Sequence, residues 1–432
     1  MIMWIIIQLN KRRSFWLIIT GIYNMCTKED FIKKFGTWSS GNANIDKIIQ
    51  ESQINNPEFS LRWIPYDNFF DIEHIADSKY YALHSARLKN YMMCNWDYEY
   101  EYRGYVALKE LKDYRYDILE FIKAIKNISN DVFNSSCITR FFGISKNPSM
   151  QNYIIVMKSG DDTIHDFLSD HFLKIWWDSK TEWLRQTIES LHVLHENDLI
   201  HCDLHSRNVS MKGRKPDPDS SYVLIDTGLC KLSNDLTYSD NKNNNVYGSI
   251  PYVPPEVLRG NEFTKEGDIY SFGGIMYEMA TGNQPFADQA HDTYLMIDIC
   301  NGVRPKVPDM MLNFIPKCYL DLMYRCWDDD PSKRPNSREL NDIISSWSSY
   351  EEFSDADLNR ERINKSHEQK LLQSLYNFHP QSCYISRHIY TLYELRDSLE
   401  DIKSGKCADL NLCTYDTDSS ESSKCIDLET QI

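Results

Sequence analysis

Hydrophobic and polar positions follow different patterns in successive parts of the chain. Between residues 30 and 53, the spacing of apolar residues predicts two short amphipathic helices, one on each side of the segment 36–41. From 61 to 109, aromatic and β-branched residues with partial alternation predict strands. The pattern becomes helical over 113–128, and the short apolar run at 153–157 has the length of a buried strand.

The chain becomes mainly helical after Gly160. The segments with long helical periodicity are 178–195, 268–281, 293–300 and 318–327. Strands first and helices afterwards predict an α+β fold with two unequal parts. Beyond residue 350 the composition shifts, because 351–432 holds 16 acidic and 9 basic residues, a net charge of −7. This part predicts a partly helical acidic tail that ends in a disordered serine-rich stretch.

Overall charge narrows the classes of partner. The 432 residues include 47 Lys and Arg against 63 Asp and Glu, a net charge of −16. We therefore expect no nucleic acid as a main partner and no docking of the protein body on an anionic membrane. Twelve cysteines are scattered without a Cys-x-x-Cys pair, which argues against a zinc ribbon and favours a reducing, cytoplasmic location.

The N-terminus is apolar in two short pieces. Residues 1–7 and 14–26 are largely apolar, and the basic run Lys11-Arg12-Arg13 separates them. A membrane-spanning helix needs about 20 apolar residues, and neither piece reaches that length. We favour a poorly ordered or locally packed extension, and membrane attachment or secretion stays open as the alternative.

Two neighbouring motifs carry residues suited to phosphoryl transfer. Residues 200–208 contain His201, Asp203 and Asn208, and an apolar strand then ends at Asp226, followed by Thr227 and Gly228. One carboxylate can accept the proton of a hydroxyl nucleophile. A second carboxylate and an amide oxygen can hold Mg²⁺ on a triphosphate, because Mg²⁺ prefers oxygen ligands.

Three further motifs follow in order, and one precedes. Tyr-Val-Pro-Pro-Glu ends at Glu256, Asp-Ile-Tyr-Ser-Phe-Gly begins at Asp268, and a Cys-Trp segment leads to Arg334. Upstream, Val-Ala-Leu-Lys ends at Lys109. In this order and spacing the motifs resemble a eukaryotic protein kinase, most closely the tyrosine-kinase-like branch, over about residues 63–347.

The resemblance implies a bilobal fold with a small β-rich N-lobe and a larger helical C-lobe. It implies an extension over 1–60, a kinase domain over 61–350 and a tail over 351–432. Within the kinase domain, the N-lobe would cover 61–157, the hinge 158–160 and the C-lobe 161–350. ATP and Mg²⁺ would be the cofactors and a protein the substrate.

The resemblance also assigns roles to single residues. Lys109 would contact the α and β phosphates and Asp203 would be the catalytic base, while Asn208 and Asp226 would bind Mg²⁺. The other residues expected at the nucleotide are Ile75, the gatekeeper Met157 and the hinge residues Lys158, Ser159 and Gly160. Glu256 and Arg334 would form a buried ion pair, and Asp268 would brace the catalytic loop.

Several positions depart from the kinase pattern. The glycine-rich loop should lie between the first two strands, where residues 75–83 contain no glycine, so we expect weakened ATP binding. Glu120 is the best candidate to pair with Lys109, although it lies one residue from the expected position, which Phe121 occupies. Cys202 replaces an arginine that normally grips an activation-loop phosphate, and we expect it to be a small buried filler.

The class of acceptor and the activity itself each leave an alternative. The segment 248–252 is similar to serine/threonine kinases, whereas Arg207 is similar to tyrosine kinases; His205 stands where serine/threonine kinases prefer Lys. We favour serine or threonine. Retention of Lys109, Asp203, Asn208 and Asp226 favours an active kinase, and the missing glycines favour the alternative, a pseudokinase that acts as a binding or scaffold module.

Overall fold

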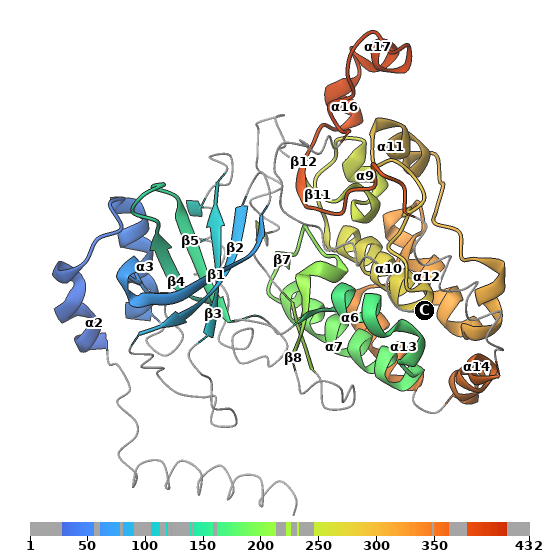
Figure 1. The fold of residues 1–432 in the computed structure, drawn as a ribbon, viewed down its shortest axis with the longest axis horizontal. Helices are drawn as coiled ribbons and strands as arrows, with labels where there is room; N and C mark the ends of the chain where they lie inside the picture. The colour runs from blue at the N-terminus through green and yellow to red at the C-terminus, as the bar shows by residue number, and fades with distance from the viewer. Residues whose placement is uncertain are drawn as a thin grey trace, which may run out of the picture.

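Strands and helices separate into two lobes (Figure 1). In the computed structural model, the structure describes residues 28–55, 61–77, 81–89, 105–112, 118, 119, 122, 139, 141–158, 162–212, 222–225, 231–232, 246–347, 350–362 and 378–412. The bilobal α+β architecture expected from the motifs is confirmed.

The N-lobe is built on one antiparallel sheet of five strands in the order β1-β2-β3-β5-β4. The strands are β1 (Phe69–Asp77), β2 (Tyr81–Leu88), β3 (Tyr105–Leu111), β4 (Phe141–Lys146) and β5 (Tyr153–Lys158). The strands predicted over 61–109 and 153–157 are therefore confirmed for the residues of these ranges that the structure describes. β3 lies at the centre, where Lys109 pairs with Leu83 on one side and Ile155 on the other.

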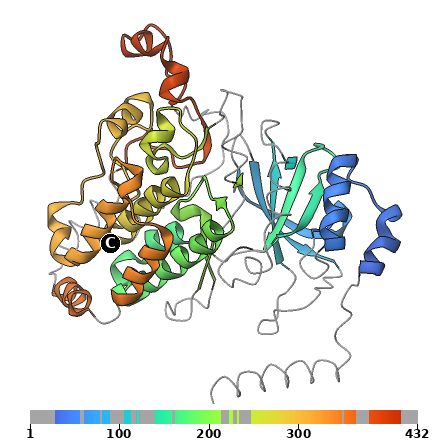
Figure 2. The ribbon, with the colours of Figure 1, turned by 180° about the vertical axis from the view of Figure 1, so that it is seen from behind.

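Two N-terminal helices cover this sheet on the side away from the C-lobe (Figure 2). They are α2 (Lys28–Lys34) and α3 (Ala43–Asn55), with a short 3₁₀ turn, η1 (Phe35–Thr37), after α2. Ile45 and Ile49 of α3 are fully buried, as helical spacing on one apolar face requires. The predicted pair of amphipathic helices is confirmed.

The C-lobe is a helical body with short strands at its edge. Its helices are α6 (Ile164–His171), α7 (Trp177–Glu196), α9 (Pro255–Leu258), α10 (Lys265–Thr281), α11 (Thr293–Cys300), α12 (Lys317–Cys326) and α13 (Ser337–Ser346). Its short strands are β6 (Asp162–Thr163), β7 (Leu199–Ile200), β8 (Val209–Lys212), β9 (Tyr222–Ile225), β10 (Lys231–Leu232) and β11 (Val246–Gly248). The 3₁₀ turns of the C-lobe are η3 (Phe172–Lys174), η4 (Ser206–Asn208), η6 (Ile250–Tyr252), η7 (Asp309–Phe314) and η8 (Pro331–Lys333). The N-lobe has the 3₁₀ turn η2 (Tyr66–Asn68) before β1.

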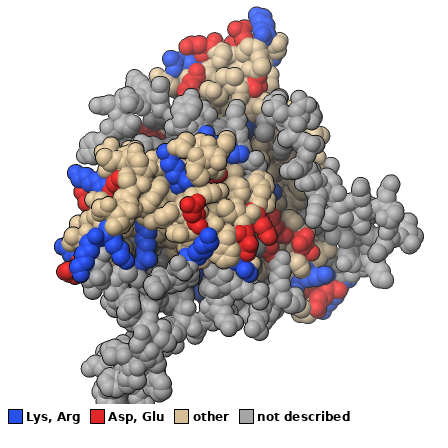
Figure 3. All heavy atoms as spheres, turned by 60° about the vertical axis from the view of Figure 1, so that its left-hand side comes forward, with Lys and Arg blue, Asp and Glu red and all other residues tan. Residues whose placement is uncertain are grey.

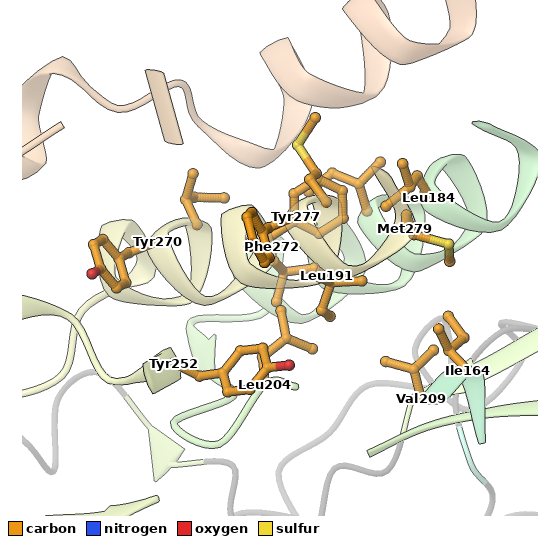
Figure 4. Packing of buried hydrophobic residues seen from close by; sticks show 14 of the residues in the cluster. Ile164, Leu184, Leu191, Leu204, Val209, Tyr252, Tyr270, Phe272, Tyr277 and Met279 are labelled. Carbon is orange, nitrogen blue, oxygen red and sulfur yellow. The ribbon is translucent and has the colours of Figure 1, made fainter. Parts of the chain in front are cut away.

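The centre of this lobe is the crossing of α10 with α7. Figure 4 shows Phe272 and Leu191 packed between the two helices, with Leu204 and Tyr252 below them. All four side chains are buried. Leu204 belongs to the segment of residues 201–208 that the sequence marks for chemistry, so the packing of α7 and α10 positions that segment.

One buried ion pair joins two distant segments of the C-lobe. The guanidinium of Arg334 donates to both carboxylate oxygens of Glu256 at 2.7 and 2.8 Å, and also to the carbonyl oxygens of Asp328 and Glu266. The two residues are 78 apart in the sequence. The pairing expected from the motifs is confirmed, and its bidentate geometry satisfies both buried charges.

The tail beyond residue 350 folds back onto the C-lobe. It contains α14 (Glu351–Glu361), β12 (Arg387–Ile389), α16 (Leu392–Leu395) and α17 (Leu399–Lys403). The helices agree with the expected partly helical tail, whereas the strand β12 was not predicted. β12 lies beside β11 in Figure 1, and α16 and α17 form the projecting red arm. The serine-rich stretch expected to be disordered lies outside the described residues.

A buried histidine anchors the start of the tail segment. His291 Nδ1 lies 2.8 Å from both the backbone N and the carbonyl oxygen of Cys383, and Nε2 lies 3.1 Å from the carbonyl oxygen of Phe286. Burial and the nearby positive charges of Arg387 and His379 lower its pKa to about 4, although the backbone hydrogen bonds act in the opposite direction. The neutral ring is therefore the form that docks the tail.

The described residues have three further general features. Within the described residues, no helix combines the length and the apolar character that a membrane crossing requires. Six cysteines of this part of the chain carry free thiols. The face shown in Figure 3 carries basic and acidic side chains side by side.

Substitution of Arg334 by Leu should lower the free energy of unfolding by about 3–5 kcal/mol, because Glu256 is left buried without its partner. Urea denaturation of the full chain measures this. The matched control is Arg325→Leu, which breaks an exposed pair with Glu339 (2.6 Å) and should cost at most about 1 kcal/mol. Equal losses in the two variants would contradict the structural importance of the buried pair.

Stability should fall as the pH is lowered from 7 to 5. His291 is neutral in the folded chain with a pKa of about 4, so between pH 4 and about 6.5 the unfolded chain binds more protons. This residue alone should account for about 2 kcal/mol over that interval. Urea denaturation at pH 7 and pH 5 checks it. The variant His291→Gln should lose this part of the slope, and an unchanged slope would refute the assignment.

Candidate functional site

Lys109 lies on the face of the central strand that turns toward the C-lobe core. Alternation along β3 places Ala107 and Leu111 in the same cluster as Met157, whereas Val106 and Leu108 belong to a separate cluster on the other face. Lys109 shares the face of Ala107 and is buried. Its Nζ lies 4.9 Å from the ring centroid of Tyr81, a cation–π contact. Neither Ala107 nor Tyr81 was predicted as part of the site.

A buried carboxylate on α10 holds the loop that carries Asp203. The Asp268 carboxylate accepts hydrogen bonds from the backbone N–H groups of His201 at 2.7 Å and Cys202 at 3.0 Å. His195 of α7 donates a further hydrogen bond to it at 2.9 Å. The bracing role expected for Asp268 is confirmed.

These bonds maintain an unusual backbone at Cys202. Its φ of 66° lies in the left-handed region, which costs a non-glycine residue about 1–2 kcal/mol. Cys202 is buried, as expected of a small filler. Its strained conformation was not predicted, and it turns the chain immediately before Asp203.

Asp203 is hydrogen-bonded to Asn208, the last residue of η4. The Asn208 amide donates to the backbone carbonyl of Asp203 at 2.7 Å and to its Oδ2 at 3.0 Å. Both amide protons are therefore used within the loop, and the amide Oδ1 remains as an acceptor for a cation. An oxygen ligand of this kind suits a divalent metal such as Mg²⁺.

The other oxygen of Asp203 faces a serine from the tail. Ser386 Oγ donates to Asp203 Oδ1 at 2.8 Å, and His205 Nε2 lies 2.9 Å from the same Oγ and 3.5 Å from Oδ1. All three side chains are buried. Sequence reasoning missed Ser386, because it is 183 residues from Asp203 and no local pattern marks it.

Asp203 is kept in its ionised form. Burial alone would raise the pKa of this carboxyl group. The charge and hydrogen bond of His205, the hydrogen bond from Ser386 and the charge of Lys109 outweigh burial and hold the pKa below its usual value. The carboxylate can thus accept a proton from a hydroxyl group.

Other predicted residues are placed only in part. Met157 is buried near the end of β5, Lys158 is the last residue of that strand, and Ile75 is exposed on β1. The predicted residues that lie outside the described part are Glu120, Ser159, Gly160 and Asp226. Their roles, and those of Ile75 and Lys158, stay predictions.

Strands that lead to two of these positions are nevertheless described. β9, which precedes Asp226, ends at Ile225 opposite Val209, the residue after Asn208. β1 and β2 pair up to Asp77 and Ala82, so the position at which kinases carry the glycine-rich loop, and at which this chain lacks the glycines, lies between these two strands. The residues of the turn itself, 78–80, lie outside the described part.

Comparison with known proteins agrees with this geometry. A family model described as protein tyrosine and serine/threonine kinase matches residues 78–344. A probable serine/threonine-protein kinase of Dictyostelium discoideum is 23% identical over 69% of this chain and 16% of its own length. A protein kinase and PP2C-like domain-containing protein of Arabidopsis thaliana is 31% identical over 34% of this chain and 26% of its own length.

A third relative has a similar match. The receptor-interacting serine/threonine-protein kinase 4 of Mus musculus is 29% identical over 38% of this chain. The match covers 21% of that relative. The chain thus spans about a quarter or less of the length of these three relatives.

Substitution of Asp268 by Asn should loosen the loop that carries Asp203. An amide offers one acceptor oxygen instead of two, so at least one of three donors loses its partner, at a cost of about 1.5–3 kcal/mol. Urea denaturation measures the loss, and hydrogen exchange at the Cys202 amide should accelerate. The control Asp309→Asn affects only an exposed ion pair with Lys306 and should change neither measurement. Unchanged exchange at Cys202 would refute the bracing role.

Proposed function

The chain belongs to the protein tyrosine and serine/threonine kinase family, and we propose that it transfers the γ-phosphoryl group of ATP to a protein hydroxyl. We infer further that the acceptor is serine or threonine. The observation that carries the proposal is the buried Asp203 carboxylate, whose Oδ1 accepts a hydrogen bond from a serine hydroxyl at 2.8 Å. That is the contact a general base needs with the nucleophile it deprotonates.

The residues around Asp203 support the transfer by positioning and by charge. Asn208 holds Oδ2, so Oδ1 alone faces the hydroxyl group. Lys109 is a buried cation close enough to lower the pKa of Asp203, and it would contact the phosphates. Asn208 and Asp226 would hold Mg²⁺, which neutralises phosphate charge when ATP is bound.

The serine at Asp203 supports serine or threonine as the acceptor. Its hydroxyl donates to Asp203 at 2.8 Å and contacts His205 Nε2 at 2.9 Å, although His205 itself stands where serine/threonine kinases prefer Lys. The segment 248–252, which is similar to serine/threonine kinases, supports the same choice. The named relatives include serine/threonine-protein kinases, which agrees with this choice.

We propose that the protein acts inside the cell on other proteins. Free thiols at Cys202, Cys326 and Cys383, all buried, support a reducing compartment. The net charge of −16 supports neither nucleic acid nor an anionic membrane as the main partner.

Substitution of Asp203 by Asn should lower phosphate transfer by about 10²–10⁴-fold, because the amide cannot accept the hydroxyl proton. The measurement is Mg²⁺-dependent transfer of labelled phosphate from ATP to a generic protein substrate by the full chain. Asp298→Asn, at an exposed position of α11, is the matched control and should retain wild-type transfer.

A wild-type rate no higher than that of Asp203→Asn would overturn the enzyme proposal. A thermal shift with ATP, with and without Mg²⁺, then separates the alternatives. A shift without transfer would identify a pseudokinase that still binds nucleotide, and no shift would identify one that has lost nucleotide binding as well, the outcome toward which the missing glycines point.

A further inference from the structure

We propose that the tail segment 382–391 occupies the acceptor site of its own kinase domain and that Ser386 is phosphorylated in cis. The inference rests on the proposed function, since it names a substrate of that same site. It goes further by identifying a serine of this chain as the acceptor. The segment also covers the site until the transfer has occurred.

The tail reaches Asp203 as an added strand. β12 pairs antiparallel with β11, with Gly248 opposite Arg387 and Val246 opposite Ile389. Ser386 immediately precedes β12, and Gly248 lies close to Asp203, because a Cβ built there would be 3.7 Å from Asp203 Oδ1. Strand addition to an exposed edge is a common mode of peptide recognition, with backbone bonds giving register and side-chain pockets giving specificity.

Side chains on both sides of Ser386 anchor this register. His291 binds the Cys383 amide, Tyr384 donates its hydroxyl to the carbonyl of Pro285 at 2.9 Å, and Arg387 donates to the carbonyl of His291 at 2.9 Å. Ile389 is fully buried. These contacts lie within three residues of Ser386 on each side. They therefore fix the position of Ser386 next to Asp203.

The hydroxyl of Ser386 is oriented for transfer. It has a single proton, which it donates to Asp203 Oδ1 at 2.8 Å. The contact with His205 at 2.9 Å must therefore be donated by His205 Nε2. One lone pair of Oγ accepts that bond, and the second remains for attack on phosphorus.

The transfer step balances with ATP as the phosphoryl donor. The Ser386 Oγ–P bond forms while the bond from the γ-phosphorus to the bridging oxygen breaks, and ADP leaves with that electron pair. The Oγ proton passes to Asp203 and then to solvent. The products are ADP and phosphoserine at position 386.

The product binds the site less well than the reactant does. A phosphoserine carries about −1.5 to −2 charges at neutral pH. At residue 386 this charge would lie beside the buried carboxylate of Asp203, where like charges repel strongly. Phosphorylation should therefore release β12 from β11 and open the acceptor site to other proteins.

The test follows phosphate at Ser386 and on a generic protein substrate in one reaction. The full chain is dephosphorylated, incubated with ATP and Mg²⁺, and sampled over time by site-resolved mass spectrometry. We expect phosphate at Ser386 with a first-order rate constant that stays unchanged over a 100-fold dilution of the protein. A rate constant that falls in proportion to protein concentration would show transfer between molecules and overturn the cis assignment.

Two variants separate this inference from the proposed function. Ser386→Ala should lose phosphate at that position and, because its tail cannot be released by phosphorylation, should phosphorylate the external substrate more slowly than wild type, whereas Asp203→Asn should lose both reactions. Ser404→Ala, in the same tail but exposed, is the matched control and should behave as wild type. If the wild-type chain phosphorylates the external substrate but carries no phosphate at Ser386, the inference is overturned and the proposed function stands. Absence of both, at the level of Asp203→Asn, would overturn the proposed function and the inference with it.

Hydrogen exchange at the β12 amides tests the release. These amides should be protected before ATP is added and should exchange at least tenfold faster once Ser386 carries phosphate. In Asp203→Asn they should stay protected with ATP present. Equal protection of phosphorylated and unphosphorylated wild type would overturn the release step.

Discussion

The carboxylate of Asp268 is the constraint on which the site depends. It sits on a helix packed in the centre of the C-lobe, and it accepts two backbone N–H groups of the catalytic loop together with the ring of His195. Those bonds hold Cys202 in a left-handed conformation immediately before Asp203. A loop without such an anchor would relax toward lower-energy backbone angles, and the Asp203 carboxylate would no longer be held in one orientation.

The two carboxylate oxygens of Asp203 have different hydrogen-bond partners. Oδ2 is tied to Asn208, which also stiffens the loop, and Oδ1 is left for the acceptor hydroxyl. Lys109 approaches from the other lobe and contributes positive charge without a hydrogen bond to Asp203 among those described. The acceptor side is completed by the tail, so parts of the chain from three separate regions meet at one carboxylate. Packing of α7 against α10 positions the loop that carries this carboxylate.

Much of this could be predicted from the sequence. Helical spacing located α3, α7, α10, α11 and α12 to within a few residues, because each buries one apolar face. The Glu256–Arg334 pair and the bracing by Asp268 were expected from the resemblance to protein kinases that the motif order carries, and both are present. The conformation of Cys202 could not be predicted, because it arises from hydrogen bonds to a residue 66 positions away. The roles assigned to Glu120 and Asp226 stay predictions.

The sequence by itself determined the two-lobed α+β architecture, the chemical groups of the site and their order along the chain. Local periodicity and short motifs encode those features, because they depend on neighbours within a few residues. Only the tertiary structure decided what occupies the acceptor position. β12 has three residues, Arg-His-Ile, too few to show alternation, and its partner strand lies about 140 residues earlier. The contact of Ser386 with Asp203 therefore exists only because the tail folds back and pairs with β11, and no local pattern encodes that pairing.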